Sequence, residues 1–327
     1  MRAIRQHEVG PAETLRFEEV PDPVAGPGRL LIRVKAAGVH LLDAAIRGGT
    51  AGDHPFAGPA LPMTPGREVA GVVEAVGEGV DPSWIGRRVV THLGIASGGY
   101  AELAVREVDA VHLIPDGLGD ASAVALIGTG RTALGILDVA ALTPDDVVLV
   151  TAAAGGIGSL IVQAAANIGA VVVAAAGGEK LARVKDVAPE ALTVDYTQPE
   201  WAEQARTALA GREVTVAFDS VGGGAGRAAL ELLGTGGRFI MYGWSAGEAT
   251  RLDADDLYAK CLQVTVALGP RMLARPGGLR SLETEAIAEG AAGRLIALTE
   301  EFALAEAAAA HRALEGRATV GKVVLVP

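Results

Sequence analysis

The fold of this chain is constrained most by a long stretch that carries no charge. From Val147 to Gly178, 32 consecutive residues include no Asp, Glu, Lys or Arg, and a run of that length could cross a bilayer. Glycines interrupt it at six positions, however, and Gln163 and Asn167 lie within it. Strands that helices cover on both faces are continuously apolar. The stretch therefore predicts a buried strand, a turn, a helix and a second strand, and it argues against a membrane span.

The alternation of strands and helices continues to about residue 268, which predicts a parallel sheet. We expect strands at Val147–Val150, Val171–Ala174, Leu192–Val194, Val214–Asp219, Arg238–Met241 and Leu262–Ala267. We expect helices between them at Gly156–Ile168, Glu179–Val187, Pro199–Ala210, Gly226–Leu233 and Ala254–Lys260. Six strands in this order are typical of the doubly wound sheet that binds dinucleotides.

The first 120 residues differ, because short strands there are separated by Gly and Pro turns. Between Leu30 and Ala36, apolar residues alternate with Arg33 and Lys35, which predicts a strand with one buried face. Further strands are expected at Val69–Val76, Arg88–Leu93 and Tyr100–Val105, and a short helix at Leu41–Arg47. These features predict a compact β-rich domain.

After Gly269 the chain is helical again, at Leu282–Glu289 and Leu304–Glu315, and it ends in a strand, Lys322–Val326. We expect this tail to return to the first domain. The predicted β-rich domain therefore comprises residues 1–121 completed by 269–327, and the parallel-sheet domain comprises residues 122–268.

Composition excludes several classes of protein. Half of the 327 residues are hydrophobic, which excludes a disordered chain. The single cysteine, Cys261, excludes a disulfide framework and fits the reducing cytoplasm. A net charge of −11, with no run of Lys and Arg longer than a pair, makes nucleic acid and anionic membranes poor partners. Residues 1–11 carry charges and no apolar core, so we expect no signal peptide.

A glycine-rich loop predicts a bound pyrophosphate. The sequence AAGGIG, from Ala153 to Gly158, follows an apolar strand and opens a helix. In that context the backbone can approach a pyrophosphate closely, and the N–H groups of the helix point at the anion. Glycines also follow the second, fourth, fifth and sixth expected strands, and open parallel sheets bind ligands at these carboxyl ends.

The end of the second strand predicts the choice of cofactor. A site that prefers NAD places an acid about 20 residues after the loop, where it binds the 2′-hydroxyl of the ribose. Here Ala176 is followed by Gly177 and Gly178, and the cations Lys180 and Arg183 come soon after. A neutral strand end with nearby cations suits a 2′-phosphate, so we expect NADPH.

Other catalytic motifs are missing from the sequence. The six histidines are His7, His40, His54, His92, His112 and His311, and none has the spacing of a metal motif. The sequence contains no G-x-S-x-G nucleophile motif. Transfer of a hydride from a nicotinamide requires little beyond correct positioning, so these absences do not argue against it.

Several segments together resemble one family over essentially the whole chain. They are Gly38–Asp43 with Arg47 and Gly49, Gly66–Gly71, Gly130–Ala133, Ala152–Gly158, Phe218–Gly222 and Gly321–Val324. In this order they resemble the zinc-free quinone oxidoreductases of the medium-chain dehydrogenase/reductase superfamily. The resemblance implies an α/β protein with a GroES-like catalytic domain, completed by the C-terminal tail, and a Rossmann domain that binds NADPH.

The resemblance also implies that no metal is bound. Zinc alcohol dehydrogenases of the superfamily have a metal-binding Cys near position 40 and a His where Arg67 stands here. Zinc requires thiolate, neutral imidazole or carboxylate ligands, and a guanidinium group provides none of these.

The resemblance assigns roles residue by residue. The residues that it places against the cofactor are His40, Thr132, Ala154, Gly155, Gly156, Ile157, Gly158, Gly177, Lys180, Tyr196, Ser220, Val221, Tyr242, Gly243, Leu268 and Lys322. It places Ala45, Tyr242 and Trp244 around the substrate. Two residues depart from the family pattern, since His40 replaces an Asn and Ala45 replaces a Tyr.

These implications lead to a soluble, cytoplasmic, NADPH-dependent reductase of quinones or α,β-unsaturated carbonyls. An enoyl reductase of free or carrier-bound acyl chains, and an NADPH-binding protein without turnover, remain alternatives. We expect a homodimer that pairs through the sixth strand, Leu262–Ala267, because an exposed apolar edge requires cover. Solvent is the expected proton source, with His40 contributing only modestly.

Overall fold

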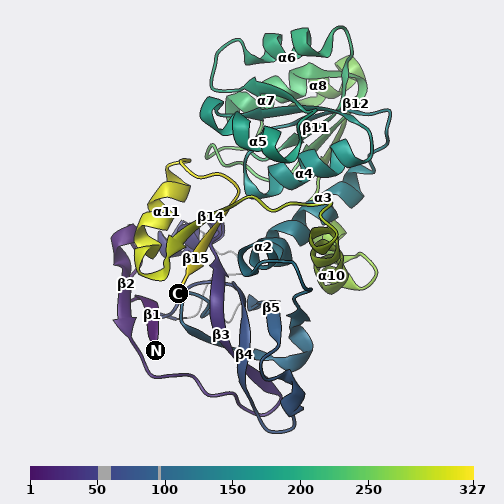
Figure 1. Cartoon of the computed structure of the whole chain (residues 1–327). Coiled ribbons are helices and arrows are strands. Elements are labelled where there is room, and N and C mark those ends of the chain that lie inside the picture. Colours follow the sequence, from purple (N-terminus) through teal and green to yellow (C-terminus); the bar gives the residue numbers. More distant parts are fainter. Residues whose placement is uncertain (51–59, 95–96) are drawn as a thin grey trace. The chain divides into compact units, whose positions relative to one another are not determined.

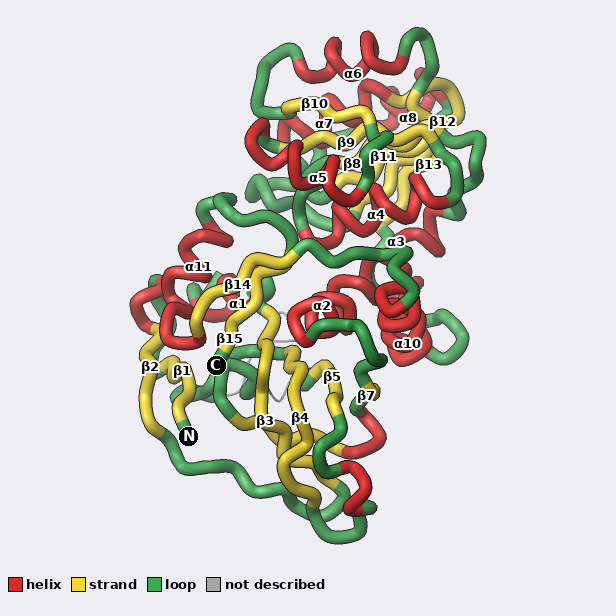
Figure 2. Tube along the Cα trace, in the orientation of Figure 1, coloured by secondary structure: helices red, strands yellow, loops and turns green. Residues whose placement is uncertain are grey.

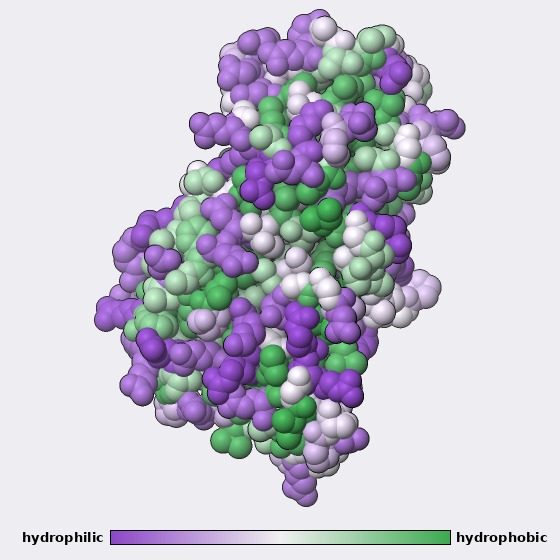
Figure 3. Space-filling view, in the orientation of Figure 1, coloured by the Kyte–Doolittle hydropathy of each residue, from purple (hydrophilic) through white to green (hydrophobic). Residues whose placement is uncertain are grey.

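The computed structural model describes residues 1–50, 60–94 and 97–327 of the chain, which form two compact units (Figure 1). Unit 1 comprises Met1–Gly128 and Ala297–Pro327, and unit 2 comprises Thr129–Ile296. His54 lies outside the described residues. On the face that Figure 3 shows, hydrophilic residues are spread among hydrophobic ones.

Unit 2 is built on a six-stranded parallel sheet with the strand order β10-β9-β8-β11-β12-β13. The strands are β8 (Val147–Val150), β9 (Val171–Ala176), β10 (Leu192–Asp195), β11 (Val214–Asp219), β12 (Leu233–Met241) and β13 (Gln263–Val266). In chain order this is the 3-2-1-4-5-6 arrangement of the doubly wound fold. The predicted fold class is confirmed, and the uncharged stretch is indeed a strand, a helix and a second strand.

Helices cover both faces of this sheet, with α4 and α5 on one face and α6 and α7 on the other (Figures 1 and 2). The helices of unit 2 are α3 (Arg131–Ala140), α4 (Gly156–Asn167), α5 (Leu181–Val187), α6 (Trp201–Leu209), α7 (Gly223–Leu232), α8 (Ala254–Lys260), α9 (Pro270–Leu273) and α10 (Gly278–Ala291). Leu149, Phe218 and Phe239 are fully buried in the sheet, which explains why these strands are continuously apolar.

Unit 1 contains a two-stranded sheet, β1-β2, and a larger sheet with the order β14-β15-β3-β4-β5-β7, in which β6 also pairs with β3. The strands are β1 (Arg2–Gln6), β2 (Leu15–Glu19), β3 (Arg29–Gly38), β4 (Glu68–Val76), β5 (Arg88–His92), β6 (Leu103–Glu107), β7 (His112–Leu113), β14 (Thr299–Ala303) and β15 (Lys322–Val326). Its helices are α1 (Leu41–Arg47), α2 (Asp120–Ala125) and α11 (Ala307–Glu315). As predicted for β3, Ile32 and Val34 are buried, whereas Arg33 and Lys35 are exposed.

Along the chain, the two units meet at other residues than predicted. The observed boundaries follow Gly128 and Ile296, whereas the predicted ones follow residues 121 and 268. Residues 269–296 belong to unit 2, because α10 packs against α3 and Arg131 Nη1 donates to Glu283 Oε1 at 2.5 Å. The amide of Gln163 also holds Ile296 to α4, donating to its carbonyl at 3.0 Å and accepting from its N–H at 2.7 Å. Only the chain after Ile296 returns to the β-rich unit.

A helical run from Asp120 to Ala140, which contains α2, a π-helical turn (Leu126–Gly130) and α3, was not predicted as helix. Among the described residues it is the one helix that has the length and apolar composition to cross a membrane. In the structure 72% of its apolar window is buried, as in the core helix of a folded domain.

A buried polar network anchors α1 inside unit 1. Asp43 Oδ2 accepts hydrogen bonds from the backbone N–H of His40 at 2.9 Å and from Tyr100 Oη at 3.1 Å. His311 Nε2 lies 3.2 Å from the same Tyr100 Oη. Because the phenol donates its one proton to Asp43, His311 Nε2 must be the donor in the second bond. Burial lowers the pKa of His311 to about 4, although the nearby Asp43 carboxylate opposes the shift.

This histidine predicts an acid sensitivity of folding. The unfolded chain protonates His311 near pH 6.5, whereas the folded chain does so only near pH 4. The unfolded state therefore binds more protons between these values, and stability falls as the pH is lowered, by at most about 1.4 kcal/mol per pH unit from this group. In urea unfolding followed from pH 7 to pH 4, His311→Gln should flatten the pH dependence. An unchanged slope in the variant would contradict this assignment.

Candidate functional site

The predicted cofactor residues of unit 2 gather at one edge of its sheet. All six strands are parallel, so their carboxyl ends lie at the same edge. The loop Ala152–Gly155 follows β8, Gly177 follows β9, and Tyr196 follows β10. Ser220 and Val221 follow β11, Tyr242, Gly243 and Trp244 follow β12, and Leu268 comes two residues after β13. The topology therefore brings together residues that are more than 100 positions apart in the sequence.

The loop after β8 is shaped for close approach of a ligand. Ala152 has a left-handed backbone, with a φ of 49°, and the chain then enters α4 at Gly156. A Cβ at Gly158 would lie 2.3 Å from the carbonyl oxygen of Ala152, so only glycine lets the helix pack this tightly against the loop. The first N–H groups of α4 have no acceptor within the helix, and they form a cradle that suits a pyrophosphate.

The loops after β9 and β10 are joined by an acid that the sequence reasoning missed. Asp195 Oδ1 accepts from the backbone N–H of Thr197 at 3.0 Å and from its hydroxyl at 2.6 Å. These bonds lower the pKa of Asp195, and a further bond from the N–H of Gly178 lowers it too. A Cβ at Gly178 would lie 2.7 Å from Asp195 Oδ2. Asp195 thus holds the turn that begins the 3₁₀ helix Gly178–Lys180, where the predicted phosphate ligand Lys180 lies.

A second buried acid organises the loop after β11. The carboxylate of Asp219 accepts from Thr151 Oγ1 at 2.9 Å and from Thr250 Oγ1 at 2.6 Å. It also accepts from the N–H groups of Val221 and Gly222 at 3.0 and 3.2 Å. Asp219 is fully buried, so these four donors compensate for the cost of burying its charge and fix the loop that carries Ser220 and Val221.

The remaining predicted residues of unit 2 differ in exposure. Tyr242 is buried, and burial raises the pKa of its hydroxyl. Trp244 is 62% exposed and Leu268 is 37% exposed. Thr132 is the second residue of α3. Nothing in the structure assigns a direct role to these four side chains.

In unit 1, three charged or titratable side chains form a cluster that we call the His40–Glu68–Lys322 cluster. His40 Nε2 lies 2.8 Å from Glu68 Oε2 and 2.9 Å from Lys322 Nζ. Lys322 Nζ also lies 2.9 Å from Glu68 Oε2, which closes a triangle. The three residues come from the start of α1, from β4 and from β15. Ala45, predicted to border the substrate, lies on α1 as well.

The surroundings of this cluster are closely packed. Glu68 is fully buried, and a Cβ at Gly38 or Gly128 would lie 2.3 or 1.5 Å from its carboxylate oxygens, so both positions require glycine. Burial raises the pKa of Glu68, but His40 and Lys322 outweigh this effect and hold the pKa well below its usual range. The carboxylate is therefore charged at neutral pH. The ring of His92 is near, with its centroid 6.4 Å from that of His40.

The residues of unit 1 do not fit a zinc ion. The Lys322 ammonium already lies within 2.9 Å of both potential donors, His40 Nε2 and Glu68 Oε2. A divalent cation between them would meet this charge at close range. Arg67, which stands where the zinc branch has a histidine, is buried and pairs with Asp43 at 3.5 Å. Over residues 1–50, 60–94 and 97–327, no three His, Cys, Asp or Glu side chains are grouped as metal ligands.

Glu68 and Lys322 lie within the segments Gly66–Gly71 and Gly321–Val324, but their pairing was not predicted from the sequence. A signal was available, because each is a charged residue at the start of an apolar strand, in the runs EVAGVV and KVVLV. A charge at such a position is buried with its strand and therefore requires a partner. Which partner it has could not be read from the chain, because Glu68 and Lys322 are 254 positions apart.

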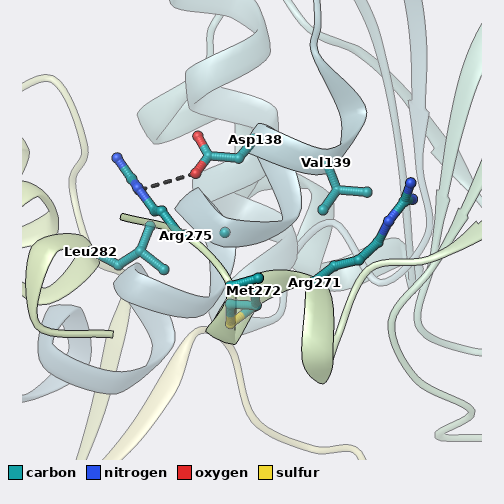
Figure 4. A pocket seen from close by; sticks show the side chains of 8 residues that line it. Asp138, Val139, Arg271, Met272, Arg275 and Leu282 are labelled. Atoms are coloured by element: carbon teal, nitrogen blue, oxygen red, sulfur yellow. Dashed lines mark ion pairs between the residues drawn. The ribbon is translucent and has the colours of Figure 1, made fainter. Parts of the chain in front are cut away.

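Unit 2 also contains a pocket that is lined by residues of α3, of α10, and of α9 with the two residues that follow it (Figure 4). In Figure 4 the side chain of Arg275 points toward Asp138, and the ion pair measures 3.0 Å. Arg275 also donates to Glu285 at 2.6 Å. Asp138, Arg275 and Glu285 thus pair with one another, and the pocket is lined by none of the residues predicted to bind cofactor or substrate.

Comparisons with known proteins agree with this architecture. Residues 26–116 match the model of the alcohol dehydrogenase GroES-like domain, and residues 188–325 match the model described as zinc-binding dehydrogenase. A 2-haloacrylate reductase of a Burkholderia species is 31% identical, covering 98% of this chain and 97% of that protein. A quinone oxidoreductase of Pseudomonas aeruginosa is 30% identical, covering 97% of each chain.

Solved structures give the same result. The quinone oxidoreductase of Escherichia coli, solved in complex with NADPH, is 28% identical and matches over 100% of both chains with a TM-score of 0.85. The full-length similarity, the two matching domains and the doubly wound sheet all point to one family. The chain belongs to the quinone oxidoreductases of the medium-chain dehydrogenase/reductase superfamily.

Proposed function

We propose that this protein is an NADPH-dependent reductase that acts on quinones or α,β-unsaturated carbonyl compounds without zinc. The observation that carries the proposal is the edge of the parallel sheet in unit 2. There the glycine-rich loop after β8 and the N-terminus of α4 suit a pyrophosphate. Relatives named quinone oxidoreductase and 2-haloacrylate reductase support the reaction class. We also propose a cytoplasmic location, which the single cysteine, Cys261, supports.

NADPH would supply the hydride for the reduction. The residues that we propose to hold it are those at the strand ends: Thr132, Ala154, Gly155, Gly156, Ile157, Gly158, Gly177, Lys180, Tyr196, Ser220, Val221, Tyr242, Gly243 and Leu268. Asp195 and Asp219 keep the loops of this edge in place. The contribution of the chain is to orient the acceptor and to exclude water from the transfer.

The substrate side of the proposal rests on Ala45, Tyr242 and Trp244. Ala45 has a small side chain where the family resemblance implies a tyrosine, and Trp244 offers an exposed aromatic ring on which a flat acceptor could stack. Because the ring of Tyr242 is buried, we propose that it supports the loop after β12 and does not stack on the substrate.

A panel of acceptors tests the function. Purified protein should oxidise NADPH when given 1,4-benzoquinone or a simple enone, measured by the loss of NADPH absorbance. Because we propose no role for zinc, elemental analysis should find less than stoichiometric metal, and EDTA should leave the rate unchanged. Turnover confined to enoyl thioesters would favour the enoyl reductase, and NADPH binding without any turnover would contradict an enzymatic function. One tightly bound zinc per chain would contradict the proposal of zinc independence.

The choice of cofactor can be tested at Lys180. If its ammonium binds the 2′-phosphate, Lys180→Ala should weaken the binding of NADPH by roughly tenfold or more, since a hydrogen bond to a charged group contributes about 1.5–3 kcal/mol. NADH, which lacks this phosphate, should lose little affinity. Lys185→Ala is the matched control, because Lys185 lies on the adjacent α5 and donates to Pro189. Equal losses for the two cofactors in a fluorescence titration would show that Lys180 does not bind the phosphate.

We further propose a homodimer that forms through β13. This strand is at the end of the six-stranded sheet, and Val266 on it is 61% exposed. An open strand edge with apolar side chains is a surface for pairing with another strand. Two copies of β13 related by a two-fold axis would continue one sheet into the other.

Light scattering tests this assembly. The wild-type protein should have twice the mass of the chain, and Val266→Lys should shift it toward the monomer, because the substitution places like charges near the two-fold axis. The matched control is Leu113→Lys, which puts the same charge on β7, the strand at the end of the larger sheet of unit 1. A monomeric wild type, or equal effects of both substitutions, would contradict pairing through β13.

A further inference from the structure

Building on the proposed function, we propose that His40 donates the proton that completes the reduction, and that Glu68 and Lys322 are the residues that position and charge its imidazole. The sequence alone favoured solvent as the proton source, because one histidine at a position where the family has an Asn is thin evidence for a general acid. The structure supplies two partners, on strands that are far apart in the sequence. Lys322, predicted to contact the cofactor, is buried against Glu68 and His40, so we assign it to this cluster instead.

Of the three side chains of the cluster, that of His40 is the most exposed to solvent. The side chain of His40 is 26% exposed, whereas those of Lys322 and Glu68 are 5% and 0% exposed. A proton therefore leaves or enters these groups most directly through the imidazole. Its Nε2 is directed at Glu68 and Lys322, so Nδ1 is the nitrogen from which a proton can be transferred away from the cluster.

The backbone of His40 is also held. Its N–H donates to Asp43 Oδ2, and this carboxylate is in turn bound by Tyr100 and paired with Arg67. General acids are effective when their position is fixed before the reaction. The ring is thus held at two points, through its backbone by Asp43 and through Nε2 by the cluster.

Charges on several elements set the protonation of the ring. Glu68 on β4 favours the imidazolium and Lys322 on β15 opposes it, each within 3 Å of Nε2. Among the described residues, His92 at the end of β5 lies near the ring, Asp43 on α1 accepts from the backbone N–H of His40, and Arg67 lies against Asp43. These two nearest charges have opposite signs and pair with each other at 2.9 Å, so both act on the ring from one side, at Nε2.

The proposed step balances in atoms and electrons. When the β-carbon of an enone receives a hydride, the electron pair of the C=C bond moves toward the carbonyl and gives an enolate. The N–H bond at Nδ1 then breaks, a C–H bond forms at the α-carbon, and the C=O bond is restored. The imidazolium becomes a neutral imidazole, which solvent protonates again at its exposed edge.

The first test is the stereochemistry of protonation. Reduction of 2-chloroacrylate or of 2-methylcyclohex-2-enone creates a stereocentre at the protonated α-carbon. With the wild type we expect one enantiomer in excess. His40→Asn keeps a hydrogen-bonding side chain but has no transferable proton, and it should lower turnover by about 10²-fold or more and give a nearly racemic product with unchanged NADPH affinity. Turnover within tenfold of the wild type with the same enantiomeric excess would overturn the proposal.

The second test uses the opposite signs of the two partners. Turnover should decline with rising pH as the imidazolium loses its proton. Glu68→Gln removes the favourable charge and should move this decline to lower pH, whereas Lys322→Met removes the opposing charge and should move it to higher pH. A general loss of stability cannot move the profile in opposite directions. Shifts of the same sign, or none, would overturn the roles of Glu68 and Lys322.

These tests separate the inference from the function on which it rests. A wild type that reduces no acceptor contradicts the proposed function and the inference together. A wild type that reduces quinones and enones, combined with His40→Asn that does so at a similar rate and selectivity, contradicts only the proton donor.

Discussion

The buried carboxylate of Glu68 is the constraint around which unit 1 is arranged. An ionised carboxylate loses several kcal/mol of hydration when it is buried, and removing one partner of such a pair typically costs 3–5 kcal/mol. Three features of the unit follow from this charge. Gly38 and Gly128 leave room for its oxygens, and His40 and Lys322 supply the opposing charge and hydrogen bonds. The pairing also explains why β15, from the end of the chain, returns to pack beside β3.

Unit 2 depends on a different constraint, which is the parallel direction of its strands. Because every strand ends at the same edge, loops that are distant in the sequence lie next to one another there. Asp195 and Asp219 each hold one of these loops by accepting hydrogen bonds from backbone and hydroxyl donors. Acids that shape loops in this way leave the edge itself lined by glycines and backbone N–H groups, which suits an anionic ligand.

The sequence predicted those parts of the fold that depend on local pattern. β11, β15, α1 and α8 have the predicted residue ranges, and the order of the six parallel strands follows from their alternation with helices. The sequence did not predict β1, β14 or the run from α2 to α3. Either the apolar residues of these segments follow no clear period, or tertiary packing decides their secondary structure. The site was predictable where glycine spacing carries the signal, as at Gly155–Gly158. The partnership of Glu68 and His40 with Lys322 was not, because no local pattern records a contact between residues 254 or 282 positions apart.

The central claim is that this chain transfers a hydride from NADPH to carbon of an acceptor, and isotope tracing tests it most directly. With NADPH that carries deuterium at both hydrogens of the nicotinamide C4, reduction of an enone in ordinary water should place deuterium on the β-carbon of the product and leave the α-carbon unlabelled. The same reaction with unlabelled NADPH in heavy water should reverse the pattern. A product without deuterium from the cofactor, or with solvent deuterium at the β-carbon, would contradict the account.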